Sequence, residues 1–175
     1  MGMIRIGHRA VPHFPDNGAV IANWGHIVFL GSARLGNSCG VEVRPKGVLT
    51  FGDNFCATAG VHIICHYKIE FSSCDLVGWN TFIMDTNSHR LITETGEFDS
   101  VGYAPVEIGS HNWIGAGCTV LPGTSTPSYC VSGTRSLLNK DYRVFGCKIV
   151  LAGCPAKIVK QGVYHDMDND LIEIP

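Results

Sequence analysis

Histidine side chains are the residues of this sequence with the clearest capacity for chemistry. The chain of 175 residues has eight of them, and His89 begins a long stretch without a regular pattern, HRLITETGEFDSVGYAPVE. An imidazole with an ordinary pKa of about 6.5 can take a proton from a hydroxyl group at neutral pH. A second chemistry is open to His62, His66 and His111, because three converging imidazoles can bind zinc. The choice between these chemistries depends on the elements that position the rings.

A six-residue repeat is the element that must position them, and it is clearest in residues 107–141, EIGSHNWIGAGCTVLPGTSTPSYCVSGTRSLLNKD. Neither the 3.6-residue period of a helix nor the alternation of a simple strand produces it. The pattern predicts an all-β solenoid, a prism in which each hexapeptide is a short strand plus a corner and three hexapeptides complete a turn. Residues eighteen apart should then stack. Two columns recur in phase: Ile108, Ile114, Val120, Thr126, Ser132 and Leu138, and Asn112, Cys118, Thr124, Cys130 and Ser136.

The repeat continues upstream with lower regularity. Phe51 and Ile69 are eighteen residues apart, and the pattern resumes at Val77 after a slip of two residues. Leu30 and Leu35, each followed by glycine, indicate that the coils begin near residue 28. The predicted organisation is an N-terminal cap at 1–27, one β-helix domain at 28–161 with an excursion loop at 89–107, and a C-terminal tail at 162–175.

Composition and charge exclude several functions. A formal net charge of -2 with 16% charged residues argues against binding to nucleic acid, which needs a basic surface. No apolar run approaches the roughly 20 residues that span a bilayer, and the first residues lack the apolar core of a signal peptide. The eight cysteines include no CxxC pair. We therefore expect a cytosolic protein, away from membranes, in which Cys118 and Cys130 are reduced packing residues.

Three segments resemble a known family. They are HNWIGAGCTVLPG (111–123), SGTRSLLNKD (132–141) and LAGCPAKIVKQ (151–161), which together with the repeat resemble the left-handed β-helix acyltransferases. Within that family the segments are most similar to the sugar and xenobiotic O-acetyltransferases. The resemblance implies a left-handed parallel β-helix, a homotrimer, acetyl-CoA as the acyl donor without a metal, and a small hydroxylated acceptor such as a sugar or cell-surface glycan precursor.

The resemblance also implies roles for individual residues. His89, at the mouth of the excursion loop, matches the catalytic base. Its ring needs a partner on the other nitrogen, either a backbone carbonyl or a carboxylate, and Asp85 or Glu97 could reach it from nearby positions in the sequence. His66 and Asp85 match positions that contact the acceptor, although Thr86, Asn87 and Ser88 depart from the Asp- and His-rich run of many relatives. The positions that match the acetyl-CoA groove are Trp113, Gly115, Ala116, Gly133, Thr134, Lys140, Lys157 and Lys160.

Three alternatives remain open from the sequence. The same fold and donor serve N-acetylation of an amino sugar. A β-helix can also be a noncatalytic assembly or binding module. In a third interpretation, His62, His66 and His111 from two subunits would hold zinc, as in carbonic anhydrases of this fold. The resemblance assigns no role to the acidic tail.

Overall fold

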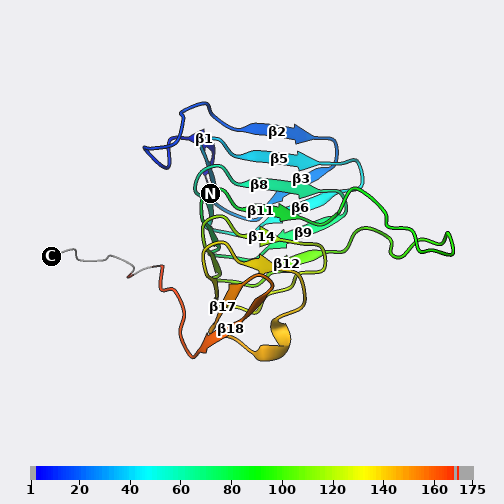
Figure 1. Cartoon of the computed structure of the whole chain (residues 1–175). Coiled ribbons are helices and arrows are strands. Elements are labelled where there is room, and N and C mark those ends of the chain that lie inside the picture. The colour runs from blue at the N-terminus through cyan, green and yellow to red at the C-terminus, as the bar shows by residue number, and fades with distance from the viewer. Residues whose placement is uncertain (1–2, 168, 170–175) are drawn as a thin grey trace.

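The chain folds into a triangular prism of stacked coils, seen in the computed structural model of residues 3–167 and 169 (Figure 1). Three sheets, here called A, B and C, form the sides of the prism, and their strands pair in parallel except for one terminal hairpin. Sheet A holds β1 (Ile4–His8), β4 (Ala33–Gly36), β7 (Phe55–Ala57), β10 (Leu76–Val77), β13 (Trp113–Ile114), β15 (Cys130–Ser132), β17 (Ile149–Gly153) and β18 (Ala156–Gln161). Sheet B holds β2 (Val20–Asn23), β5 (Gly40–Val43), β8 (His62–Cys65), β11 (Phe82–Met84), β14 (Thr119–Val120) and β16 (Leu137–Leu138). Sheet C holds β3 (His26–Phe29), β6 (Val48–Phe51), β9 (Lys68–Phe71) and β12 (Val106–Ile108), and one 3₁₀ turn, η1 (Arg143–Phe145), follows β16.

The predicted all-β architecture, a left-handed parallel β-helix, is confirmed. Among the described residues, no helix has the length and apolarity to cross a bilayer.

The predicted stacking is confirmed after the excursion and wrong before it. Ile114 pairs with Ser132 and Val120 with Leu138, eighteen residues apart as expected. Upstream, Phe51 pairs with Phe71 rather than with Ile69, so the coil is twenty residues long there. The reason is strand length: β6 and β9 have four residues with two inward positions, whereas β13 and β14 have two residues with one.

Aromatic side chains fill the wider early coils. The rings of Phe51 and Phe71 are stacked with centroids 5.7 Å apart, and Phe55 lies tilted between them at 4.6 and 4.7 Å. All three side chains are buried. Burying an apolar side chain of this size contributes roughly 1.5–3 kcal/mol, so this cluster is a main source of stability.

The first coil begins earlier than the predicted boundary at residue 28. Strands β1, β2 and β3 already pair in parallel with β4, β5 and β6. Residues 4–29 therefore form the terminal coil, and they cover the core of the coil below them. Ile4 and Ile6 are in register with the inward-facing Ala33 and Leu35 but remain exposed, as expected at the open end of a solenoid.

The excursion is an arm that leaves the prism between β11 and β12 (Figure 1, right). Isolated antiparallel bridges join Thr86 to Tyr103 and Ile92 to Phe98, which makes the arm a narrow hairpin. Its large apolar side chains are exposed in the single chain: Leu91, Ile92, Phe98, Val101 and Tyr103. Such an apolar surface on a projecting element is typical of a contact with another protein chain.

Candidate active site

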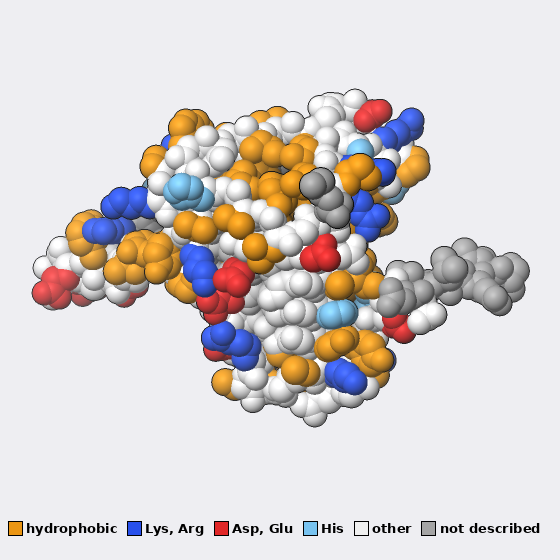
Figure 2. Space-filling model, turned by 180° about the vertical axis from the view of Figure 1, so that it is seen from behind, with side chains coloured by type: hydrophobic (Ala, Val, Ile, Leu, Met, Phe, Trp, Pro, Cys, Tyr) orange, Lys and Arg blue, Asp and Glu red, His pale blue; other side chains and the backbone are white. Residues whose placement is uncertain are grey.

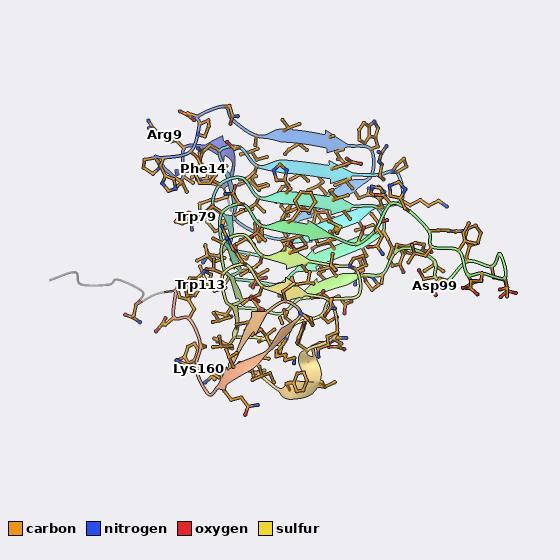
Figure 3. All side chains as sticks on the ribbon, in the orientation of Figure 1. Arg9, Phe14, Trp79, Asp99, Trp113 and Lys160 are labelled. Atoms are coloured by element: carbon orange, nitrogen blue, oxygen red, sulfur yellow. The ribbon has the colours of Figure 1, made fainter. Side chains whose placement is uncertain are left out.

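Trp113 lies on the outer face of sheet A, beside the corner where the chain turns from sheet A to sheet B. It stands between two inward-facing residues, Asn112 and Ile114, and is 39% exposed. In Figure 3 its side chain points away from the prism on the side opposite the arm. The strand alternation therefore presents a large ring on the surface, two residues before Gly115.

The corner next to Trp113 is a column of residues with little or no side chain. A Cβ on Gly115 would lie 2.6 Å from the Ser132 carbonyl oxygen, and one on Gly78 would lie 2.7 Å from the Ala116 nitrogen. Consecutive coils thus touch backbone to backbone at this corner, which only glycine permits. The result is a narrow, smooth surface along the axis of the prism.

The predicted groove residues contribute to this corner in different ways. The N–H groups of Gly115 and Gly133 donate to the carbonyl oxygens of Ser132 and Leu151, so both are used in pairing between coils. Both N–H groups are thus engaged within the protein. Ala116 and Thr134 follow them and are half-buried and exposed, respectively.

The three predicted lysines do not form one cluster. Lys157 and Lys160 lie on β18, opposite the outward-facing Ala152 and Val150, on the same sheet as Trp113. Figure 3 shows Lys160 below Trp113 on that side of the molecule. Lys140 instead follows β16 of sheet B, with its Nζ 5.5 Å from the ring centroid of Tyr142 and 5.9 Å from that of Phe145. Only the pair on β18 shares a surface with Trp113.

His89 lies at the start of the arm and is exposed. Figure 3 shows Asp99, near the arm's tip, on the opposite side of the prism from Trp113. The arm of one chain therefore points away from the Trp113 surface of the same chain. A site that uses both must combine two chains.

Asp85 is buried and has both carboxylate oxygens engaged. Oδ1 accepts the N–H of His66 and Oδ2 accepts the N–H of Tyr67, each at 2.8 Å. The carboxylate thus closes the corner of the preceding coil, one turn away from the arm. Burial, followed by this nearby charge, raises the pKa of the Cys65 thiol to about 12. The contacts of Asp85 are those of a structural residue.

Glu97 lies in the turn at the far part of the arm. Its N–H donates to the Thr93 hydroxyl at 3.2 Å, and its carbonyl accepts the Thr93 N–H at 2.8 Å. Within the described residues, neither Glu97 nor Asp85 forms a hydrogen bond to His89. Within one chain, the predicted contact of either carboxylate with the His89 ring is therefore not formed, and the group that orients His89 stays a prediction.

The other histidines occupy three separate places. His62 stacks on Phe82 on the outer face of sheet B, with centroids 5.4 Å apart. The half-buried His66 has its Nε2 3.4 Å from Glu42 Oε1, at the corner between sheets B and C. His111 stacks on Tyr129 at 4.6 Å, at the corner between sheets C and A. Among the described residues of one chain, no group of three metal-ligating side chains comes together.

A second feature beside Trp113 escaped the sequence analysis. At the corner before sheet A, five coils each contribute one residue with a positive φ, between 57° and 61°. These residues are Asn54, Cys74, His111, Tyr129 and Lys148. The C-terminal segment lies against this column, with His165 5.0 Å from Trp113 and Lys148 Nζ 4.7 Å from the Tyr164 ring centroid. Together they line a cavity of about 280 Å³. The signal in the sequence was their place, one residue before each inward-facing position.

Comparison with known proteins connects this architecture with acyl transfer. No model of a known protein family matches the chain. One relative is WbbJ of Escherichia coli (strain K12), which is named as an inferred O-acetyl transferase of lipopolysaccharide biosynthesis. The two sequences are 29% identical over 150 residues, which cover 81% of this chain and 74% of WbbJ. The chain spans about half the length of three other curated relatives, between 43% and 56%, and all are named as acetyltransferases.

Two solved structures share the fold. The polySia-specific acetyltransferase NeuO superimposes with a TM-score of 0.62 at 16% identity, over 87% of this chain and 76% of NeuO. A mutant of AntD, an N-acyltransferase from Bacillus cereus in complex with dTDP-4-amino-4,6-dideoxyglucose and coenzyme A, has a TM-score of 0.64 at 17% identity, over 82% and 77% of the chains. The stacked coils thus have the fold of these two acyltransferases. The chain is similar over most of its length to hexapeptide-repeat acetyltransferases, and it is an acyltransferase.

Proposed function

We propose that the protein transfers an acetyl group from acetyl-CoA to a hydroxyl of a sugar or glycan precursor, at a site shared by neighbouring chains of a homotrimer. The observation that carries the proposal is the glycine corner beside Trp113, where two successive coils approach backbone to backbone. A thin pantetheine arm fits such a surface, and Trp113 offers a ring against which it can pack. WbbJ and NeuO, by their names, acetylate glycan-related acceptors, and AntD binds coenzyme A.

Each group of residues has a part in holding the donor. Gly115 and Gly133 let the arm approach the backbone, with Ala116 and Thr134 lining the same corner. Lys157 and Lys160 lie on the same sheet and supply positive charge for the phosphates of the nucleotide end. Lys140, at a different corner, has a less direct place in this arrangement.

His89 of the neighbouring chain takes the proton from the acceptor hydroxyl as the oxygen attacks the thioester carbonyl. The C–S bond then breaks, and the imidazolium returns its proton to the sulfur that leaves. A positioned base of this kind contributes about 10²- to 10⁴-fold. The exposed arm, with its apolar side chains, provides the contact that brings His89 to the neighbour's Trp113 surface.

A cytosolic location belongs to the same proposal. All eight cysteines are free, and four of them lie in the core of the prism. Reduced thiols of this number are usual in a compartment that keeps cysteines reduced.

The decisive test is release of free coenzyme A from acetyl-CoA in the presence of neutral sugars, sugar phosphates, nucleotide sugars and amino sugars. We expect acetyl-ester formation with a hydroxylated acceptor and loss of turnover in His89→Ala. Products stable to mild base would show N-acetylation instead. Failure of every acceptor, together with absent coenzyme A binding in calorimetry, would favour a noncatalytic module.

Two further measurements address assembly and metal. Light scattering should give about three times the chain mass of 18.9 kDa, and a monomer that turns over would contradict the shared site. Metal analysis of the purified protein decides on the zinc alternative, because stoichiometric zinc would require His62, His66 and His111 to meet across two chains.

A further inference from the structure

Two arginines continue the outward-facing column of sheet A beyond Trp113. The strand pairings place Trp113 beside Leu76, Leu76 beside Cys56, Cys56 beside Arg34, and Arg34 beside Arg5. Neighbouring strands lie about 4.8 Å apart, so Arg34 is roughly 14 Å from Trp113 along this column. Leu76 and Cys56, both half-buried, form an apolar strip between the ring and the charges.

The arginine pair lacks a matching negative charge. Arg5 and Arg34 are exposed and directly opposite each other in register, and no ion pair of either is present among the described residues. The carboxylate of Asp53, in the nearby corner, is turned to the N–H groups of Ser32 and Asn54. Like charges opposite each other on neighbouring strands are unfavourable, and a bound anion would offset that cost.

The surroundings of the pair provide space and further polar groups. A surface cavity of about 320 Å³ is lined by Met3, Arg5, Ser32, Arg34, Asn54 and Phe55. Figure 2 shows Lys and Arg side chains gathered at the upper right, beside this end of the solenoid. Two adjacent guanidinium groups can bind a carboxylate or phosphate through paired hydrogen bonds, which ammonium groups cannot reproduce.

The same column has a second cationic end. From Trp113 the pairings lead through Val131 and Val150 to Lys160, which is three strands away, as is Arg34 on the other side. Trp113 thus stands midway between two basic regions. If Lys157 and Lys160 bind the phosphates of acetyl-CoA, then Arg5 and Arg34 remain available to bind the acceptor.

We propose that Arg5 and Arg34 form an anion site for the acceptor, which is therefore a sugar carrying a phosphate or carboxylate group. This inference rests on the proposed acetyl transfer at Trp113. The chemistry shared by a nucleotide sugar, a sugar phosphate and an acidic sugar is an anionic oxygen group at a distance from the hydroxyl that is acetylated.

The experiment compares matched acceptors and matched variants. Initial rates are measured with glucose, glucose 1-phosphate, UDP-glucose and N-acetylneuraminic acid for the parent, Arg5→Ala, Arg34→Ala, Arg34→Lys and Arg44→Ala. Arg44 is the control, because it pairs with Glu42 at another corner of the prism. Binding of the same sugars without acetyl-CoA, and of coenzyme A alone, is measured by calorimetry.

We expect the parent to prefer at least one anionic sugar over glucose, with the preference falling as salt is raised. Arg34→Ala should raise the KM for that sugar about 10- to 100-fold, the usual loss for a hydrogen bond to a charged group. Arg34→Lys should recover part of it, and Arg44→Ala should match the parent. The identity of the preferred sugar separates phosphate from carboxylate recognition.

Three results would overturn the inference: equal use of neutral and anionic sugars, arginine variants that keep the preference, or arginine variants that weaken coenzyme A binding instead. If no sugar is acetylated, the proposed function fails on its own. Calorimetry then still decides on the anion site, because sugar phosphate or N-acetylneuraminic acid must bind to the parent more tightly than to Arg34→Ala.

Discussion

The coils before the arm and those after it are built differently. Most strands of the earlier coils have four residues, and their core contains large rings, Phe51, Phe55 and Phe71. Strands β12 to β16, after the arm, have two or three residues, and the inward positions of these later coils include Thr126, Ser132 and other small polar side chains. The wide coils supply most of the buried aromatic area. Close backbone approach at glycines occurs in both sets, at Gly36 in the earlier coils and at Gly115 in the later ones, and of these two only Gly115 lies next to Trp113. In the proposed function, stability and donor binding therefore depend on different parts of one prism.

His89→Ala tests whether the chemistry depends on the arm rather than on either set of coils, and it has the largest expected effect. The arm lies outside both sets of coils, so loss of the imidazole should lower the acetylation rate by about 10²- to 10⁴-fold and leave folding unchanged. Coenzyme A affinity should stay near the parental value. Ser88→Ala, at the neighbouring exposed position, is the control.

The pH dependence of the same variant provides a second check. In the parent the rate should fall in acidic solution, because only a neutral imidazole accepts a proton. His89→Ala should lose that dependence. A variant that acetylates at the parental rate would remove His89 from the mechanism and leave the arm as an assembly element.

Phe55→Ala tests whether the aromatic core of the earlier coils is a main source of stability. The side chain is buried in the early coils against two other rings, so its removal should cost about 3–5 kcal/mol in the free energy of unfolding. Denaturant titration measures this loss, and Ser132→Ala in the later coils should cost far less. Similar losses at both positions would show that the two sets of coils contribute equally.

Gly115→Ala and Gly133→Ala are a matched pair within the later coils. A Cβ at Gly115 would lie 2.6 Å from the backbone oxygen of Ser132, whereas one at Gly133 meets its nearest atom, the Ala152 Cβ, at 3.3 Å. We expect Gly115→Ala to cost about 1–3 kcal/mol and to weaken coenzyme A binding. Gly133→Ala should fold like the parent, and thermal unfolding with calorimetry measures both. Equal tolerance would mean that the corner is not closely packed.

The sequence predicted the later coils in detail because their period is constant. Each inward residue from Ile108 to Leu138 is buried as expected, since six-residue spacing determines which side chains face the core. The same reasoning failed for the earlier coils, because their longer strands lengthen the turns: Phe51 pairs with Phe71, twenty residues on, and Leu35 pairs with Ala57, twenty-two residues on.

The candidate site was predictable only in part, because its members lie on different surfaces. The resemblance identified Trp113, but the sequence could not place the arm on the opposite side of the prism. It also could not show that Asp85 uses both of its oxygens at a corner of the preceding coil. The arginine column went unnoticed, since Arg5 and Arg34 become neighbours only through the register of β1 and β4. Spacing predicts burial, whereas surface sites depend on which strands become neighbours.

The last and smallest expected effect concerns Asp75, an inward-facing carboxyl at the junction between the two kinds of coil. Its Oδ1 accepts the Asn112 N–H at 2.9 Å, while Oδ2 is buried without a partner among the described residues. Burial raises the pKa of this carboxyl well above its usual range. The folded state therefore favours the protonated form more than the unfolded state does.

A carboxyl whose pKa is raised on folding stabilises the protein least at high pH. Its contribution is fully present below the unfolded pKa of about 4 and is lost as the pH rises through the folded value, at about 1.4 kcal/mol for each unit of the shift. Asp75→Asn keeps an oxygen for the Asn112 N–H and carries no charge. We expect it to unfold at a higher temperature than the parent at pH 8, and to differ less from the parent at pH 5. Asp85→Asn, where both oxygens already accept backbone N–H groups, should instead destabilise the protein at both pH values. If Asp75→Asn were destabilising at pH 8 by as much as Asp85→Asn, the Asp75 carboxylate would have to be stabilised in its charged form.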